Sequence, residues 1–150
     1  MRRNLIEHPV NVDASNVDDL KTKDFVFVCV DRGDARKLIV DALLEAKVPF
    51  IDVGMGVELV GQQLLATLRV TASTAARPPG FDPRKVMDCA PPSPNALYGS
   101  NIQVVDLNAL NAALAVLRWK KMLGFYLDHE REHHATFSTS MHLLTGDYSP

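Results

Sequence analysis

The sequence has 150 residues, of which 47% are hydrophobic and 23% charged, and its 16 Lys and Arg against 18 Asp and Glu give a formal net charge of -2. A chain of this size buries roughly two thirds of its unfolded surface, so it needs no disulfide or metal to fold as one domain. The lack of a basic excess argues against nucleic acid as a partner, and no apolar run approaches the roughly 20 residues of a membrane helix. Two widely separated cysteines, Cys29 and Cys89, indicate neither a disulfide framework nor a structural zinc, so we expect a cytoplasmic protein.

The chain opens with a polar segment, residues 1–23, that predicts only weak elements. Val10–Val12 predicts a short edge strand, and Asn16–Leu20 predicts a capped helical turn. The strongest local pattern follows at Asp24–Val30, a β-branched and aromatic run without alternation. Such a run is typical of a strand buried on both faces of a parallel sheet. We therefore expect a central strand, in which Cys29 is a small buried side chain.

A helix and a second strand follow this run. A turn is expected directly after it, in which Asp34 caps the coming helix. Apolar residues at helical spacing over Ala35–Ala46 predict an amphipathic helix, and Val48–Met55 predicts the next strand. Strand, helix and strand within 24–56 make a βαβ unit, so the fold class is α/β.

The second half of the chain predicts a different arrangement. Gln62–Thr71 is typical of an antiparallel or edge strand, and the proline-rich segment 73–100 predicts a crossover loop. A helix is expected over Leu107–Leu123, capped by Asp106 or Asn108 and ended by Gly124. Its expected apolar surface consists of Ala112, Ala113, Val116, Leu117 and Trp119. His134–Met141 predicts a final strand, followed by a tail at 146–150. Together these elements predict a partial Rossmann-like, three-layer domain with parallel core strands and a later mixed or antiparallel region.

Asp31 and Arg36 are the candidate site residues of the βαβ unit. Asp31 lies at the carboxyl end of the first strand, where ligands collect in open α/β sheets, and a carboxylate there suits a metal, a ribose or phosphate-bound Mg²⁺. Alternatively, Asp31 only begins the turn into the helix. Arg36 is placed to reach a phosphate across the same edge; the alternative is a solvent-exposed helix arginine paired with Asp34 or Asp41.

Two further motifs match known sites incompletely. The pair Gly54 and Gly56 follows a strand, but Leu59 occupies the position of the third glycine of a dinucleotide fingerprint. We therefore interpret the two glycines as a sharp turn off the strand. Cys89 lies on the proline-rich loop, and an inert loop cysteine is favoured over a nucleophile because no neighbour supplies an evident base.

His129, Glu130 and His133 match the H-E-x-x-H pattern, in which two imidazoles one helical turn apart bind zinc. This predicts a zinc hydrolase as a distant alternative. The extended metzincin pattern fails because Thr136 occupies its glycine position. A solvated helix end is the favoured interpretation.

Several segments, taken in order, resemble the second part of the ThiF/MoeB/HesA family, the bacterial relatives of ubiquitin-activating enzymes. They are Asp24–Asp31, Ala35–Arg36, Lys47–Gly54, Gly61–Gln62, Ser100–Ala112 and Trp119–Phe125. The family pattern there is an apolar strand that ends in aspartate, an arginine a few residues on, a helix, and a strand with Pro and Gly. The resemblance covers residues 4–147, and its motifs agree in order and spacing.

The resemblance implies an adenylyltransferase that uses Mg-ATP to activate the C-terminal glycine of a ubiquitin-like or sulfur-carrier protein, and that forms a homodimer. It implies that Asp31 holds the nucleotide's magnesium and that Arg32 and Arg36 belong to the nucleotide site, with Asp31 and Arg36 catalytic. Joining a carboxylate to a phosphate brings two anions together, so Mg²⁺ and cations are needed there.

The sequence departs from the family in two respects. The glycine-rich ATP loop and the phosphate-contacting arginine and lysine should precede Met1, and the zinc-binding CxxC pairs of many members are missing. We expect residues 1–150 to be the C-terminal part of the domain, inactive as a lone chain. Its parts would be an entry segment at 1–23, the βαβ unit at 24–56, the crossover loop at 73–100 and the helix at 107–123. The alternative is a non-catalytic dimerisation or interaction module.

Overall fold

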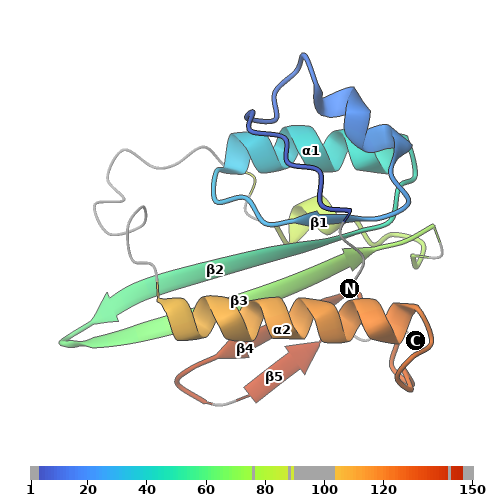
Figure 1. Cartoon of the computed structure of the whole chain (residues 1–150). Coiled ribbons are helices and arrows are strands. Elements are labelled where there is room, and N and C mark those ends of the chain that lie inside the picture. Colours follow the sequence, from blue (N-terminus) through green and yellow to red (C-terminus); the bar gives the residue numbers. More distant parts are fainter. Residues whose placement is uncertain (1–3, 76, 88, 90–103, 142, 147–150) are drawn as a thin grey trace.

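The computed structural model describes residues 4–75, 77–87, 89, 104–141 and 143–146, which form an α/β fold around a five-stranded mixed sheet (Figure 1). The strands are β1 (Val26–Val28), β2 (Phe50–Val60), β3 (Gln63–Ser73), β4 (His134–Ser138) and β5 (Leu143–Gly146), and they lie side by side in this order. The helices are the 3-10 helices η1 (Val17–Thr22) and η2 (Pro83–Lys85) and the α-helices α1 (Gly33–Glu45) and α2 (Val105–Met122). β1 and β2 are parallel, and the other neighbouring pairs are antiparallel.

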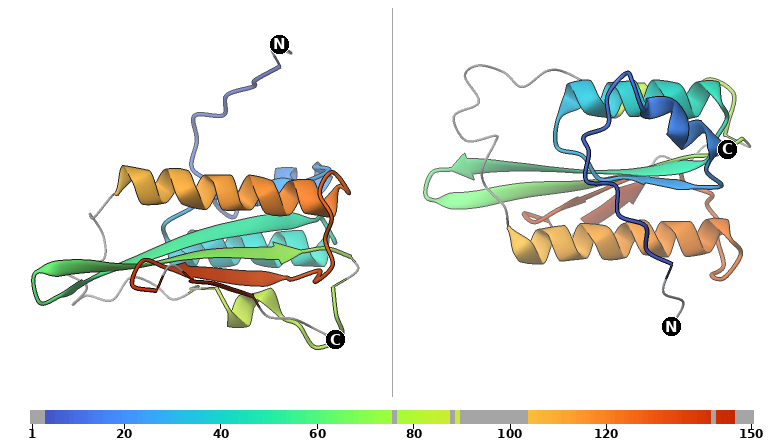
Figure 2. Two further views of the ribbon diagram at one scale, coloured as in Figure 1. Left: turned by 90° about the horizontal axis from the view of Figure 1, so that it is seen from below. Right: turned by 45° about the horizontal axis from the view of Figure 1, so that its top comes forward.

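The two α-helices cover opposite faces of the sheet, so the molecule has three layers (Figure 2). Successive residues of a strand point to opposite faces, and Phe50 and Ile51 show the consequence. Phe50 packs into the cluster below α1 with Leu43, while Ile51 packs into the cluster below α2 with Ala115. η1 lies beside α1 in the same layer.

The predicted βαβ unit is confirmed, because β1, α1 and β2 follow one another and the two strands pair in parallel. The helix begins earlier than expected, with Arg32 as its N-cap and Asp34 in its first turn. The expected N-cap at Asp34 is therefore wrong, although the Asp34 carboxylate still accepts the amide hydrogen of Ala35 at 2.9 Å.

The expected central position of the first strand is wrong for the described sheet, because β1 is a three-residue strand at one edge. Its side chains alternate: Val28 is buried, whereas Phe27 is partly exposed and contacts the rings of Phe25 and Trp119. Cys29 follows the end of the strand and is exposed, so its expected burial is also wrong. The expected strand at Val10–Val12 is absent, since these described residues are not in a strand.

The glycines after the second expected strand do not turn the chain. Gly54 and Gly56 both lie inside β2, which runs on to Val60. The turn comes at Gly61, whose φ of 63° is the left-handed value that a two-residue hairpin connection needs. β3 then returns antiparallel to β2, as predicted, but between two neighbours instead of at an edge.

The predicted helix at 107–123 is confirmed as α2, but its buried face differs from the expected one. The N-cap is Val104, so neither Asp106 nor Asn108 caps it, and Gly124 follows its end with φ of 73°. The buried residues are Asn111, Ala115 and Arg118, with Leu114, Trp119 and Met122 partly buried. The four expected apolar residues Ala112, Ala113, Val116 and Leu117 are exposed. Asn111 and Arg118 are buried because each finds a partner: Asn111 donates to the Gly54 carbonyl of β2, and Arg118 donates to the Asp128 carboxylate in the segment between α2 and β4.

The strand predicted at His134–Met141 is confirmed as β4, which ends at Ser138, but it is not the final strand, because β5 adds a further antiparallel strand to it. Residues 147–150 of the expected tail lie outside the described residues. Within the expected crossover loop the described residues include η2, while 76, 88 and 90–100 lie outside the described residues. In the described part of the chain, no helix combines the length and apolar character that crossing a membrane requires.

Candidate functional site

The candidate site is the edge of the sheet at the carboxyl end of β1, directly before α1. Asp31 lies there with an exposed side chain, and no hydrogen bond or ion pair within the described residues engages its carboxylate. Arg32 beside it is also exposed and binds Asp34 through two contacts, Nε to Oδ1 at 3.1 Å and Nη2 to Oδ2 at 2.5 Å. Asp31 is therefore the open carboxylate of this edge.

Arg36 lies behind this edge and not on it. Its side chain is only 7% exposed, its Nε donates to the Asp52 Oδ1 at 3.0 Å, and its Nη2 donates to the carbonyl oxygen of Val30. The expected alternative of an exposed helix arginine paired with Asp34 or Asp41 is wrong. Because Val30 directly precedes Asp31, the bond from Arg36 holds the backbone that presents the Asp31 carboxylate.

Asp52 and Arg69 complete a buried network with Arg36, and the sequence analysis missed both. Asp52 is fully buried in β2, and its Oδ2 accepts the Arg69 Nη2 at 2.8 Å. Arg69 also donates from Nη1 to the carbonyl of Val86 at 3.2 Å. A charged residue inside the apolar run Phe50–Val53 was the available signal, because a buried carboxylate requires a cationic partner.

Gly54 makes room for this network. Gly54 and Arg69 are directly paired across β2 and β3, and a Cβ at Gly54 would lie 2.5 Å from the Arg69 Nη2 and 2.8 Å from its Cζ. The Arg69 guanidinium thus occupies the space that a side chain at position 54 would fill. The Gly54 carbonyl also accepts the side-chain amide of Asn111 at 3.0 Å, which links α2 to the same point of β2.

Burial dominates the electrostatics around this network. Burial raises the pKa of the Asp52 carboxyl, and the charges of Arg36 and Arg69 act in the opposite direction. Burial likewise raises the pKa of the Cys89 thiol, which packs against the cluster below α1 and feels the charges of Arg36 and Asp52. A thiol with a raised pKa stays protonated and is a poor nucleophile, which agrees with Cys89 as an inert loop cysteine.

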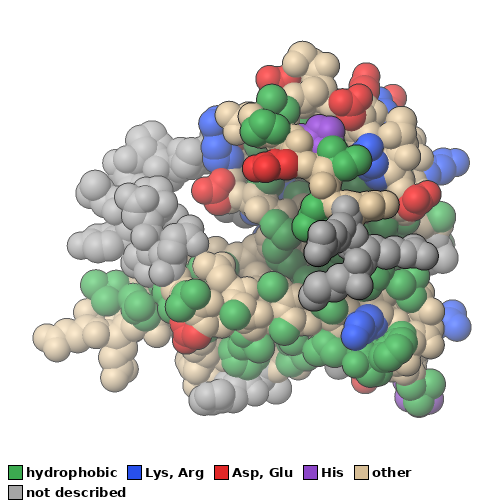
Figure 3. Space-filling model, in the orientation of Figure 1, with side chains coloured by type: hydrophobic (Ala, Val, Ile, Leu, Met, Phe, Trp, Pro, Cys, Tyr) green, Lys and Arg blue, Asp and Glu red, His purple; other side chains and the backbone are tan. Residues whose placement is uncertain are grey.

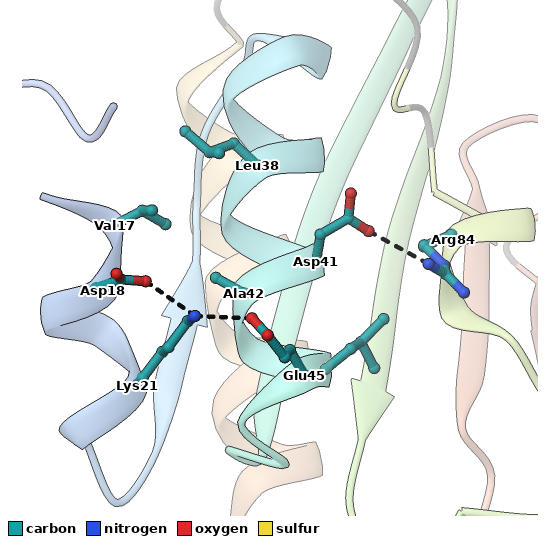
Figure 4. A pocket seen from close by; sticks show the side chains of 9 residues that line it. Val17, Asp18, Lys21, Leu38, Asp41, Ala42, Glu45 and Arg84 are labelled. Carbon is teal, nitrogen blue, oxygen red and sulfur yellow. Dashed lines mark hydrogen bonds and ion pairs between the residues drawn. The ribbon is translucent and has the colours of Figure 1, made fainter. Parts of the chain in front are cut away.

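A second feature near α1 is an open hollow of about 580 Å³ between η1, α1 and η2 (Figure 4). Its charged groups are already paired. Lys21 Nζ lies 2.9 Å from Asp18 and 2.7 Å from Glu45, and Arg84 Nη1 lies 3.3 Å from Asp41. Asp31 does not line this hollow. We interpret its ion pairs as links between neighbouring elements.

The H-E-x-x-H segment is not helical, so the spacing that would bring His129 and His133 together on one helix face is absent. Arg131 within it has a φ of 47°, and the His133 Nδ1 lies 3.3 Å from the carbonyl oxygen of Ala72. Within the described ranges, no three His, Cys, Asp or Glu side chains gather in a way that could hold a metal ion. The expected helix end at this segment is wrong as well.

Comparison with known proteins found no match: no protein-family model and no curated protein matches the sequence.

Proposed function

We propose that this chain is the Rossmann-like, C-terminal part of a ThiF/MoeB/HesA-type adenylyltransferase domain, in which Asp31 holds the magnesium of ATP. The observation that carries the proposal is the exposed, unengaged Asp31 carboxylate at the carboxyl end of the parallel pair β1 and β2. This is the edge at which open α/β sheets bind nucleotides. The acceptor would be the C-terminal carboxylate of a ubiquitin-like or sulfur-carrier protein.

The donor chemistry of this edge fits a magnesium nucleotide. Mg²⁺ prefers oxygen ligands and is commonly held by one or two carboxylates together with substrate phosphates and waters, so Asp31 alone suffices on the protein side. When bound, the ion would neutralise charge on the phosphates. Arg32 supplies a cation beside Asp31, and Arg36 acts as a positioning residue through the Val30 carbonyl.

We propose further that this chain alone does not adenylate. The turn that leads from Asp31 into α1 contains one glycine, Gly33, and is not a glycine-rich turn of the kind that cradles phosphates at a helix N-terminus. An ATP–pyrophosphate exchange assay tests this point: we expect no exchange, whereas robust exchange that is lost in Asp31→Ala would refute the inactivity.

The metal role of Asp31 is tested by titrating the labelled protein with Mn²⁺ and ATP and recording amide line broadening by NMR. We expect broadening centred on the residues around Asp31, and its loss in Asp31→Asn. Asp34→Asn is the matched control, because Asp34 is three residues away but already bound to Arg32, and it should retain the broadening. Broadening that is unchanged in Asp31→Asn contradicts the proposal.

Self-association is a second candidate function, favoured by the outer face of α2. Val105, Leu110, Val116 and Leu117 expose between 37% and 82% of their surface there, and Figure 3 shows hydrophobic side chains gathered along this helix. Apolar patches of this kind mark association surfaces. We propose a homodimer through this face, with or without catalysis.

Sedimentation at high micromolar concentration tests the homodimer. We expect a dimer that Val116→Glu dissociates, because a carboxylate on the outer face of α2 would have to be desolvated at the interface. Leu59→Glu, at an exposed apolar position of the β2–β3 hairpin, is the control and should leave the dimer intact. A strictly monomeric wild-type protein excludes this candidate.

A further inference from the structure

A cavity of about 150 Å³ lies between the C-terminal half of α2 and the face of β3, β4 and β5, apart from the Asp31 edge. α2 contacts β2 and β3, and β4 and β5 continue the sheet beyond β3. The cavity walls include the fully buried Leu68 of β3, Leu114 of α2, Ala135 of β4 and Leu144 of β5. The cavity thus has an apolar interior formed from both layers.

The size of the cavity defines the apolar part of a ligand. An apolar protein cavity of about 150 Å³ is known to bind a benzene ring and to stay dry without one. A single six-membered ring therefore fits this space, whereas two fused rings do not.

Charged side chains on the wall define the polar part. Arg118 and Lys121 contribute two positive charges and Glu132 one negative charge to the lining. Arg118 already binds Asp128 at 2.7 Å. Lys121 is one-third exposed, and its Nζ lies 3.5 Å from Glu132, which is longer than a charge-assisted hydrogen bond of about 2.7–2.9 Å. Lys121 therefore retains the capacity to bind a second oxygen anion at the opening.

We propose that this cavity binds a monocyclic aromatic carboxylate, with the ring between α2 and the sheet and the carboxylate on the Lys121 ammonium. The two imidazoles of the lining already have partners, since the His133 Nδ1 lies 3.3 Å from the Ala72 carbonyl oxygen and the His134 Nδ1 lies 2.9 Å from the Thr71 hydroxyl. The proposal is independent of the nucleotide site, since none of its residues contributes to the Asp31 edge.

Benzoate is the probe, titrated into the full chain and followed by NMR. We expect saturable binding, with contacts from the ring protons to the methyl groups of Leu68, Leu114 and Leu144. Benzyl alcohol, which lacks the charge, should bind about tenfold more weakly, and 2-naphthoate, which has two fused rings, should not bind in the cavity. Ring contacts to other residues, equal affinity for benzyl alcohol, or binding of 2-naphthoate to the same methyl groups would overturn the proposal.

Two pairs of variants separate the ring site from the charge site. Ala135→Leu fills the cavity and should abolish benzoate binding, while Ala113→Leu, on the exposed face of α2, should leave it unchanged. Lys121→Met should weaken binding about tenfold, while the control Lys120→Met alters a lysine that lies over the Phe125 ring and should not. Unchanged affinity in Lys121→Met or in a folded Ala135→Leu contradicts the proposal. If Ala135→Leu does not fold, the ring contacts in the wild-type protein decide.

Discussion

At the scale of single residues, Asp52 joins three elements, because Arg36 of α1 and Arg69 of β3 both bind its buried carboxylate in β2. Asp52→Asn keeps the shape but removes the charge that two buried guanidinium groups share. Removing one partner of a buried ion pair costs about 3–5 kcal/mol, so we expect a loss of this size in the free energy of urea unfolding.

Asp34→Asn is the control for Asp52→Asn, because Asp34 also pairs with an arginine but is exposed. Its free energy of unfolding should change little. If Asp52→Asn is no less stable than Asp34→Asn, then the buried network does not hold the three elements together.

Gly54 provides a second prediction at this scale. In Gly54→Ala the new Cβ would overlap the Arg69 guanidinium, which the bond to Asp52 prevents from moving freely. Overpacking of this kind costs about 1–3 kcal/mol, measured as a lower free energy of unfolding. Gly56→Ala is the matched control two residues along β2, where a Cβ meets nothing within 4 Å, and it should be neutral or stabilising. Equal effects of the two variants would contradict the assigned role of Gly54.

At the scale of elements, the pairing of β3 with β4 begins at His133, which uses both backbone and side chain. Its carbonyl accepts the Ala72 amide hydrogen at 2.7 Å, and its Nδ1 lies 3.3 Å from the Ala72 carbonyl. Burial lowers the pKa of His133 from its usual 6.5, and the charge of Arg118 acts in the same direction, whereas the bond to the Ala72 carbonyl and the charge of Asp128 oppose the shift. The neutral imidazole is therefore the form that the fold favours.

The sign of the pH dependence follows from this lowered pKa. An unfolded chain takes up the proton near pH 6.5 while the folded chain resists it, so the stabilisation is complete above about pH 6.5 and is lost as the pH falls below it. We expect urea unfolding to show a larger loss of stability between about pH 7.5 and 5.5 in the wild type than in His133→Gln. Parallel losses in the two proteins would assign the pH dependence to other groups.

Local patterns predicted both α-helices and the strands β2, β3 and β4, but they predicted the surroundings of these elements poorly. The helical spacing after Asp34 and the turn-forming Gly124 identified both α-helices, because these signals lie within one segment. The edge position of β1 depends on strand order, which no local pattern contains. The buried face of α2 was wrong because Asn111 and Arg118 are polar residues whose partners, Gly54 and Asp128, lie outside the helix.

For the candidate site, the sequence likewise predicted the position of a residue along the chain but not its contacts. Asp31 could be placed at the carboxyl end of a strand from its position alone, and the structure puts it there with an exposed side chain. The burial of Arg36 could not be foreseen, because it depends on Asp52 across the βαβ unit and on Arg69 across the β2–β3 register. The sequence predicts the order of strand, turn and helix around Asp31, although β1 already ends at Val28. A network that crosses three elements requires their arrangement in space.

At the scale of the whole molecule, the three layers separate the features that we assign to function. The Asp31 edge lies beside α1, and the ring-sized cavity lies below α2 on the other side of the sheet. The near-neutral net charge of -2 means that attraction for an anionic nucleotide must be local. The central claim is therefore that a single carboxylate, Asp31, positions a metal-bound nucleotide at this edge.

Anomalous scattering from crystals of the protein grown with Mn²⁺ and ATP tests that claim most directly. We predict a manganese peak about 2.0–2.2 Å from an Asp31 carboxylate oxygen, with phosphate density on its far side, and no such peak in Asp31→Asn. A manganese peak at another group of residues, with the Asp31 carboxylate left free, would contradict the account.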